Sequence, residues 1–319
     1  MEDTATSARF PFPANPNGWF RVAYTSELAK GEVLPLYLLG QDLVLYRDED
    51  GQAHMIDAFC QHLGAHLGHG GCVEGSSIRC PFHHWLWGAD GELVEVPYAK
   101  RRPPKAKMRT WEICEKNGLV MVWHHDQGQP SAYKLPDLPQ YGHGDWTDYE
   151  VRKWKVKSRW LDMNENAVDR IHFLYVHGTH TAPETDVEVD GHILRCRSRM
   201  KMGSAQGEFT GGIDTTDYGP GFQTVDVTGA VDTLMVNTAT PIDDEYTDVS
   251  FAYSVNTSTG TDAARGVGQA IIKDLEHQMG QDIVLWENKK YFARPMLCDG
   301  DGEFGAYRRW MRQFFSEDW

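Results

Sequence analysis

The chain has 319 residues, 41% of them hydrophobic, which is enough to bury the core of two ordinary domains and excludes bulk disorder. Its formal net charge of −15 argues against binding to nucleic acid or to an anionic membrane surface. No apolar run is long enough to span a bilayer, and the polar, Pro-rich start lacks the apolar stretch of a secretory signal, so we expect a cytoplasmic protein.

The cysteines are few and widely spaced, which is not the pattern of a disulfide-stapled scaffold. They lie at positions 60, 72, 80, 114, 196 and 298. We therefore expect a reducing compartment, with any specialised cysteine acting as a metal ligand.

Short β-rich runs separated by turn residues fill the first part of the chain. They predict strands at residues 33–39, 43–47, 54–58, 77–80, 85–87, 93–96 and 118–123. This pattern predicts a compact all-β domain at residues 18–126. Residues 127–148 are rich in Pro, Gly and polar side chains and are predicted to be a linker.

The remainder, residues 149–319, predicts a second domain of different character. A strand at 149–159 and a helix at 161–177 come first, followed by strands at 185–202, 222–227, 231–241 and 247–256 and a long helix at 262–291. Strands closed by a final helix indicate an α+β domain with a cavity between sheet and helix.

The first part of the chain carries two mixed ligand pairs, Cys60-x-His62 and Cys80-x-x-His83. Two facing loops with these pairs could hold one [2Fe–2S] cluster, with thiolates on one iron and imidazoles on the other. A Cys₂His₂ zinc site is the alternative, although zinc fingers usually keep like ligands together. His84 is also adjacent, and the spacing favours His83.

The second part carries Asp169-x-x-His172 and then His177. Two histidines and a carboxylate on one face of Fe(II) form the facial triad of O₂-activating sites. Five residues turn an ideal helix through about 500°, so a π-bulge or a helix end near His177 is needed to bring the two rings together. A pair of structural histidines is the alternative. Asn166, one turn before Asp169, either shapes the site or is an ordinary polar helix residue.

The third ligand must come from another segment, and the late helix offers several carboxylates. The candidates are Asp274, Glu276, Asp282 and Glu287. The basic run at residues 98–109 (YAKRRPPKAKMR) is either a docking face for an acidic ferredoxin or reductase, or a solvated loop.

The two motifs together resemble those of Rieske non-haem iron oxygenase α-subunits. Within that family the chain is similar to the 3-ketosteroid 9α-hydroxylase oxygenases and the cholesterol 7-desaturases. The resemblance rests on GWFRVAY, DAFCQHLGAHLG, EVPYAKRRPP, ENAVDRIHFLYVHGT, DIVLWENK and RRWMRQFF, which span residues 18–315.

This resemblance implies a Rieske [2Fe–2S] domain followed by a helix-grip catalytic domain with an antiparallel sheet and a long C-terminal helix. It implies that His172, His177 and Asp282 bind a mononuclear Fe(II). It also implies that Asp169 bridges to a cluster-ligating histidine of a neighbouring subunit in a homotrimer.

The resemblance further implies a terminal oxygenase of a multicomponent monooxygenase. Such an enzyme uses O₂ and electrons that a ferredoxin or flavin reductase delivers from NAD(P)H, and it hydroxylates an apolar, polycyclic, steroid-like substrate. Desaturation and O- or N-demethylation use the same machinery. A Rieske electron carrier without oxygenase activity, and a zinc-stabilised ligand-binding protein of the helix-grip fold, are the alternatives from other classes.

Overall fold

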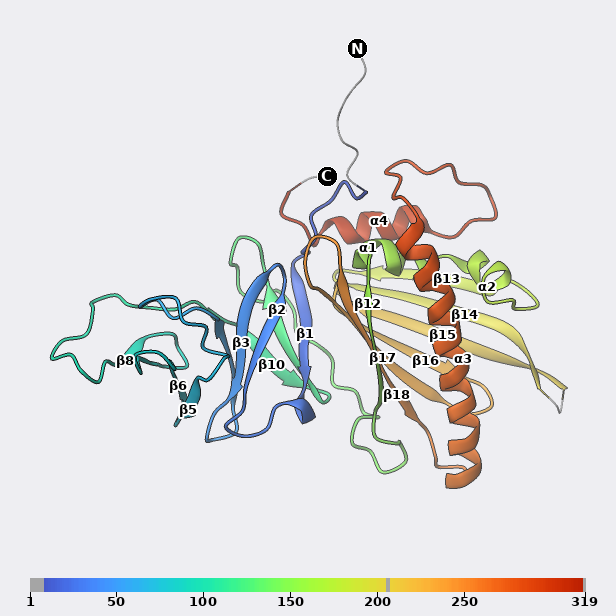
Figure 1. Ribbon diagram of the computed structural model, residues 1–319. Coiled ribbons are helices and arrows are strands. Elements are labelled where there is room, and N and C mark those ends of the chain that lie inside the picture. Colours follow the sequence, from blue (N-terminus) through green and yellow to red (C-terminus); the bar gives the residue numbers. More distant parts are fainter. Residues whose placement is uncertain (1–8, 205–206, 318–319) are drawn as a thin grey trace, which may run out of the picture. The chain divides into compact units, whose positions relative to one another are not determined.

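The computed structural model describes residues 9–204 and 207–317 and divides the chain into two compact units (Figure 1). One unit comprises Trp19–Asp137, and the other comprises residues from Leu138 onward together with the segment that ends at Gly18. The division between Asp137 and Leu138 lies inside the segment 127–148. Within the described residues no helix combines the length and apolar character needed to cross a membrane.

The first unit consists of short strands in three small antiparallel sheets. One sheet has the order β1-β11-β10, a second β2-β3-β4-β9 and a third β5-β6-β7-β8. The strands are β1 (Gly18–Tyr24), β2 (Val33–Leu38), β3 (Gln41–Arg47), β4 (Ala53–Asp57), β5 (Cys72–Glu74), β6 (Ser77–Arg79), β7 (Leu86–Trp87), β8 (Leu93–Glu95), β9 (Thr110–Trp111), β10 (Ile113–Lys116) and β11 (Leu119–His124), with a 3₁₀ turn η1 (Thr25–Glu27).

The core of this unit contains Val44, Ile56, Ile78 and Trp87, and the sulfur side chains of Cys60 and Cys80 belong to the same cluster. The loops that carry the cysteines therefore pack against buried apolar side chains, and the burial of these side chains is the main contribution to holding the loops in place.

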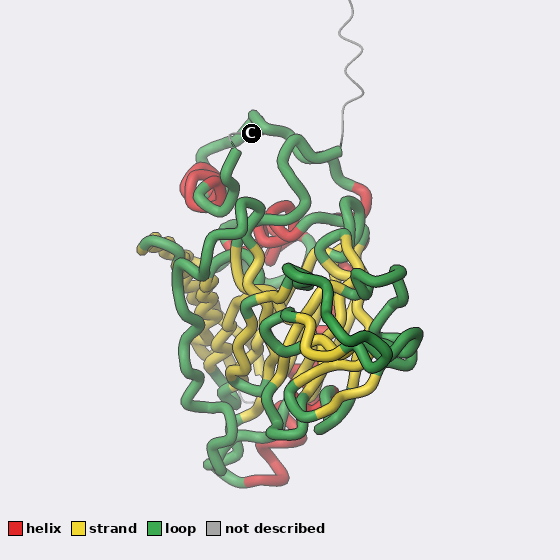
Figure 2. Tube along the Cα trace, turned by 90° about the vertical axis from the view of Figure 1, so that its left-hand side faces the viewer, coloured by secondary structure: helices red, strands yellow, loops and turns green. Residues whose placement is uncertain are grey.

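The second unit is built on one antiparallel sheet with the order β12-β18-β17-β16-β15-β14-β13, whose strands are labelled in Figure 1. In Figure 2 strands are drawn in yellow and helices in red. Helix α3 crosses one face of this sheet (Figure 1). The elements are β12 (Glu150–Val156), α1 (Trp160–Met163), η2 (Asn164–Ala167), α2 (Arg170–Tyr175), β13 (Glu184–Asp190), β14 (Ile193–Ser204), β15 (Gly207–Tyr218), β16 (Phe222–Thr228), β17 (Thr233–Pro241), β18 (Thr247–Val255), α3 (Thr261–Asn288) and α4 (Phe304–Arg312).

Helix α3 packs through one stripe of side chains. Among the described residues, the buried positions together with the half-buried Leu275 follow a spacing of three or four residues, which is the period of one helix face; they are Ala264, Gly268, Ile272, Leu275, Met279, Asp282 and Trp286. Gly268 permits a close approach to β18, since a Cβ atom there would lie 2.6 Å from the Val255 side chain. The polar Asp282 thus lies on the inward face of an otherwise apolar stripe.

Two expected elements are corrected by the structure. The helix expected at 161–177 is interrupted into α1, η2 and α2, because Asp169 has a non-helical backbone (φ −88°, ψ 89°) and caps a new helix. The strand expected at 185–202 is a hairpin of β13 and β14 that turns at Gly191, where φ is 56°. Strand β15 was not predicted, because three glycines and two aspartates, residue types depleted in strands, interrupt the sequence GEFTGGIDTTDY.

Ion pairs to buried carboxylates fasten α1 and η2 to the C-terminal helices. Glu165 on η2 accepts a hydrogen bond from Arg308 Nε on α4 (2.6 Å), and Lys289 at the end of α3 lies 3.2 Å from Asp162. Burial raises the pKa of Glu165, and Arg308 only partly offsets this effect. Ion pairs therefore hold the segment that leads into α2, and each buried carboxylate is stabilised only while its cation is present.

Arg308→Met should destabilise the protein by about 3 kcal/mol, because it leaves the Glu165 carboxylate buried without its main cation. The folded-state pKa of Glu165 is raised, so folding takes up a proton and stability falls as pH rises above the ordinary value of 4.5. Without Arg308 this pKa rises further, so the fall should extend to higher pH. Urea unfolding at about pH 5 and about pH 8 measures both effects.

The matched control is Arg309→Met on the exposed neighbour in the same helix, which should change the unfolding free energy by less than about 0.5 kcal/mol. Equal stability of the two variants at both pH values would show that the Glu165–Arg308 pair does not hold η2.

Candidate metal centres

Two loops of the first unit carry the Cys/His pairs, and they fold alike. The amide of Gly64 donates to the carbonyl of Cys60 (2.9 Å), and the amide of His84 donates to the carbonyl of Cys80 (3.1 Å). Gly64 and His84 both have a positive φ, 74° and 58°. In each loop, the fourth residue after the cysteine thus turns the chain back, and the exposed His84 takes the turn position that glycine takes in the other loop.

The side chains of the motif converge in pairs. Cys60 and Cys80 are each 2% exposed, and the rings of His62 and His83 have centroids 4.7 Å apart. Burial raises the pKa of the Cys60 thiol, and the neighbouring Cys80 adds to this effect. His83 Nδ1 is buried and has no hydrogen-bond partner in the described part of the chain. Paired thiols and a buried, unsatisfied imidazole nitrogen fit the donor set of a [2Fe–2S] cluster.

Two tryptophans support this site. Trp85 stacks on His62 with ring centroids 4.4 Å apart and planes within 7°. Trp87 Nε1 donates to Cys60 Sγ at 3.3 Å. An N–H donor to a ligand sulfur stabilises its negative charge, and hydrogen bonds of this kind tune the reduction potential of iron–sulfur sites.

The geometry disfavours the zinc alternative for these four residues. Ligand atoms of one zinc ion lie within about 4.6 Å of one another, because Zn–ligand bonds do not exceed about 2.3 Å. Across residues 9–204 and 207–317, one group of three or more potential ligands gathers within 4.8 Å, and it lies in the second unit. The Cys/His pairs are therefore spread more widely than a single ion requires.

That compact group consists of His172, His177 and Asp282. His172 belongs to α2, His177 follows the end of α2, and Asp282 lies on α3. His177 Nε2 is 3.4 Å from Asp282 Oδ2, and the two imidazole rings have centroids 5.1 Å apart. The side chains of His177, His172 and Asp282 are 3%, 10% and 13% exposed, so the site is nearly closed to solvent.

The end of α2 explains how two histidines five residues apart meet. The carbonyl of His172 accepts from the amide of Val176 at 2.7 Å and, more weakly, from the amide of His177 at 3.4 Å. The second bond closes a wider, π-type turn. The expectation of a helix end or π-bulge near His177 is confirmed.

Hydrogen bonds orient both imidazoles. His172 Nδ1 donates to the backbone carbonyl of Asp169, and His177 Nδ1 donates to Gln281 Oε1 (3.0 Å). Both Nε2 atoms are thereby left for the site, which is how metal-binding histidines are usually fixed. The Asp282 Oδ1 atom is buried without a hydrogen-bond partner among described residues. The two Nε2 atoms and the Asp282 carboxylate are ligand atoms that fit a divalent iron, whose positive charge would satisfy them.

Electrostatics at the two histidines differ. Burial lowers the pKa of His172. Burial also acts to lower the pKa of His177, but hydrogen bonds to Asp282 and Gln281 outweigh it, and the pKa is raised overall. Gln281 was not identified as a residue of the site from the sequence. Its position beside Asp282 was the one feature of the sequence that could have indicated this role.

Asp169 and Asn166 lie beside this site. The Asp169 carboxylate caps α2 by accepting from the amides of Ile171 (3.1 Å) and His172 (3.3 Å). Asn166 Oδ1 accepts from Trp286 Nε1 (3.4 Å), and Asn166 lines the cavity next to the histidines. Asp169 therefore contacts the helix that carries His172, whereas Asn166 contacts α3 at the cavity.

The other acidic candidates are engaged elsewhere. Asp274 accepts from Gln278 (2.8 Å), Glu276 pairs with Arg152, and Glu287 accepts from the amide of Lys157 (3.0 Å). Of the four carboxylates considered on the late helix, the structure brings Asp282 to the histidines.

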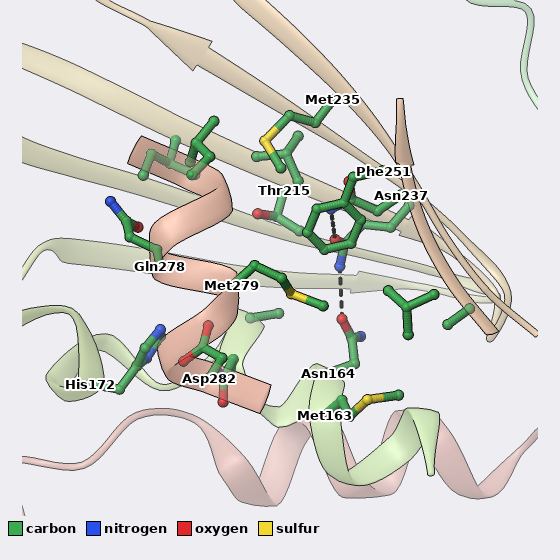
Figure 3. A pocket seen from close by; sticks show the side chains of 18 of the residues that line it. Met163, Asn164, His172, Thr215, Met235, Asn237, Phe251, Gln278, Met279 and Asp282 are labelled. Atoms are coloured by element: carbon green, nitrogen blue, oxygen red, sulfur yellow. Dashed lines mark hydrogen bonds between the residues drawn. The ribbon is translucent and has the colours of Figure 1, made fainter. Parts of the chain in front are cut away.

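A cavity opens between α3 and the sheet, beside the three candidate ligands. Most of its lining is apolar and comes from β15–β18, α1 and α3, including Met163, Val225, Met235, Phe251 and Met279. Figure 3 shows His172 and Asp282 at one side of this space and Asn164 and Asn237 at the other. An apolar chamber next to a metal site suits an apolar substrate.

Part of the basic run at 98–109 makes contacts within its own unit. Arg102 donates to the carbonyl of Leu93 (2.6 Å), Lys107 pairs with Glu92 (2.8 Å), and Arg109 lies over the Trp111 ring (3.8 Å). These contacts neither require nor exclude a docking partner.

Comparison with known families matches both halves of the chain. The family "Rieske [2Fe-2S] domain" matches residues 18–112, and the family "3-Ketosteroid 9alpha-hydroxylase C-terminal domain" matches residues 122–315.

Individual relatives cover most of the chain. A 3-ketosteroid-9-alpha-monooxygenase oxygenase component of Rhodococcus rhodochrous is 32% identical over 93% of this chain and 83% of its own. The cholesterol 7-desaturase nvd of Xenopus laevis is 29% identical over 96% of this chain and 73% of its own.

Solved structures share the fold at lower identity. Dicamba monooxygenase bound to dicamba has a TM-score of 0.77 at 18% identity, covering 94% of this chain and 97% of its own. NdmA of Pseudomonas putida CBB5 with caffeine has a TM-score of 0.77 at 19% identity, covering 92% and 89%.

These findings confirm the predicted fold, a Rieske domain followed by a catalytic domain with a large antiparallel sheet and a long helix. They also confirm the predicted enzyme class and cofactor types, an oxidoreductase with a [2Fe–2S] cluster and a mononuclear iron. The chain belongs to the Rieske oxygenase α-subunits whose catalytic domain is of the 3-ketosteroid 9α-hydroxylase type.

Proposed function

We propose that this oxygenase component hydroxylates an apolar, polycyclic substrate of steroid-like size. The observation that carries the proposal is the group His172, His177 and Asp282 at the side of an apolar cavity. The names of the relatives, a 3-ketosteroid monooxygenase component and a cholesterol desaturase, support a substrate of this class.

Within this proposal the residues have distinct roles. Cys60 and Cys80 hold one iron of the cluster and His62 and His83 hold the other, while His172, His177 and Asp282 hold the mononuclear iron. When bound, the two cofactors supply electrons and O₂ activation. The chain itself fixes the imidazole tautomers through the Asp169 carbonyl and Gln281, and it lines most of the cavity with apolar side chains.

Asp169 and Asn166 are proposed as positioning residues. The Asp169 carboxylate caps α2 and starts the turn that carries His172. Gly302 packs closely against this junction and leaves no room for a side chain, since a Cβ atom there would lie 1.7 Å from the Val168 carbonyl oxygen. Asn166 fixes the Trp286 indole at the cavity wall. A substrate that enters the cavity therefore meets a preorganised surface.

The partners are proposed from the family resemblance. A ferredoxin or flavin reductase delivers electrons from NAD(P)H in the cytoplasm, and the exposed basic residues within 98–109 are a candidate docking face. In a head-to-tail homotrimer, heterologous contacts close into a ring. Asp169 then links the iron site to a cluster-ligating histidine of the neighbouring subunit.

Desaturation is the second candidate function, because the Xenopus laevis relative is named a desaturase. Incubation with ¹⁸O₂, a surrogate reductase and a panel of steroids separates the two reactions. Hydroxylation places one ¹⁸O atom in the product, whereas desaturation gives a product two hydrogens lighter without ¹⁸O. Failure of every apolar polycycle to be converted would contradict the proposed substrate class.

Gln281→Leu should weaken Fe(II) binding at the mononuclear site by roughly 10- to 100-fold, because His177 Nδ1 loses the acceptor that fixes its tautomer. Competition with a chromophoric chelator measures the affinity, and acid-labile sulfide reports an unchanged cluster. Gln278→Leu, one turn earlier in α3 and bonded to Asp274, is the matched control and should bind Fe(II) normally. Asp282→Ala should lose the mononuclear iron altogether. Wild-type Fe(II) affinity in Gln281→Leu would show that Gln281 does not support the iron site.

Asp169→Asn should keep both metal sites, because asparagine caps helices as well as aspartate does. Turnover should nevertheless fall by roughly tenfold or more, since the bridging carboxylate loses its charge. The readouts are iron and sulfide content, far-UV circular dichroism and the product formation rate. Wild-type turnover in this variant would exclude a role for the carboxylate in electron transfer.

A further inference from the structure

Three methionines line the cavity, and one of them lies beside a candidate iron ligand. They are Met163 on α1, Met235 on β17 and Met279 on α3. Methionine fills irregular apolar space, so a buried methionine needs no further role by itself. The place of Met279 on its helix sets it apart from the other two.

Met279 lies on the same face of α3 as Asp282, one turn earlier. Residues three positions apart on a helix are neighbours, with Cβ atoms about 5–6 Å apart. Both side chains line the cavity, and Met279 is 3% exposed. In Figure 3 the Met279 side chain extends from the helix into the cavity, in the direction of Asn164. The thioether therefore enters the cavity on the turn of the helix that also carries the candidate iron ligand.

Met235 provides a contrast within the same cavity. It belongs to a packed cluster that includes Ile272 on α3. Ile272 precedes Asp282 by ten positions, from 272 to 282, which is about 15 Å along the helix axis. Figure 3 likewise shows Met235 on the sheet, away from His172 and Asp282. The two methionines share one cavity and differ in their distance from the candidate iron site.

We propose that Met279 is a modification site, where the thioether takes one oxygen atom from O₂ and becomes a sulfoxide when electrons reach the enzyme without a substrate in the cavity. This inference rests on the proposed function, because it requires the iron that His172, His177 and Asp282 are proposed to hold. The sulfur forms one S–O bond, and the O–O bond breaks. The second oxygen leaves as water, with two electrons from the reductase and two protons from solvent. Hydroxylation of a substrate consumes the same co-reactants.

The modification changes the cavity because it converts an apolar side chain into a polar one. A thioether sulfur is polarisable and is oxidised more readily than hydrocarbon side chains, and its sulfoxide is polar. Apolar side chains form most of the lining around Met279. The modified enzyme should therefore bind apolar substrates more weakly until a methionine sulfoxide reductase restores the thioether.

Peptide mass spectrometry tests the inference after the iron-loaded protein is incubated with ¹⁸O₂, NADPH, a plant-type ferredoxin and its flavin reductase, with catalase present and no substrate. Met279 should carry one ¹⁸O atom. Met296 is fully exposed and reports a diffusible oxidant, whereas Met235 reports an oxidant that spreads through the cavity. Met279 should be labelled at least about tenfold more than either, because a group held beside the reacting centre has a high effective concentration.

Asp282→Ala is the control for the origin of the oxidant, and it should abolish the label because the variant should not hold the iron. Equal labelling of Met279 and Met296, or a label that persists in Asp282→Ala, would assign the oxidation to a diffusible oxidant and overturn the inference. An unlabelled Met279 in protein that carries the mononuclear iron would overturn the inference and leave the proposed function standing. Wild-type protein that binds no mononuclear iron would overturn both.

Discussion

The carbonyl of His172 accepts from the amides of both Val176 and His177, and the catalytic unit depends on this widened turn. A regular helix would direct the two histidines to different faces. Here α2 begins at the Asp169 cap and ends where its last turn opens, so that both imidazoles reach Asp282 on α3. The ion pairs around Glu165 and the close contact at Gly302 hold this short segment in place.

The cavity follows from the same arrangement. One stripe of α3 packs on β16–β18 through residues such as Ile272, and farther along the helix the stripe reaches Asp282. Apolar residues line most of the space between sheet and helix, and an environment of low polarity strengthens electrostatic interactions at the candidate iron site.

The fold class and six of the seven candidate metal ligands could be predicted from short-range patterns, whereas Asp282 was selected from four carboxylates by the family resemblance. Spacing favoured His83 over His84, and the structure shows the reason, since His84 takes a left-handed turn position while the His83 ring faces His62. What the sequence could not supply depends on tertiary contacts. Gln281 contributes through a bond to His177, 104 positions away, and the hairpin at Gly191 interrupts a run with continuous strand character.

The function of this protein requires that one chain carry a [2Fe–2S] cluster and a separate mononuclear iron. The most direct measurement is the iron, zinc and acid-labile sulfide content of anaerobically purified protein. We expect about three irons and about two sulfides per chain, with a red-brown colour. Zinc without sulfide in a colourless protein would contradict the presence of both iron sites.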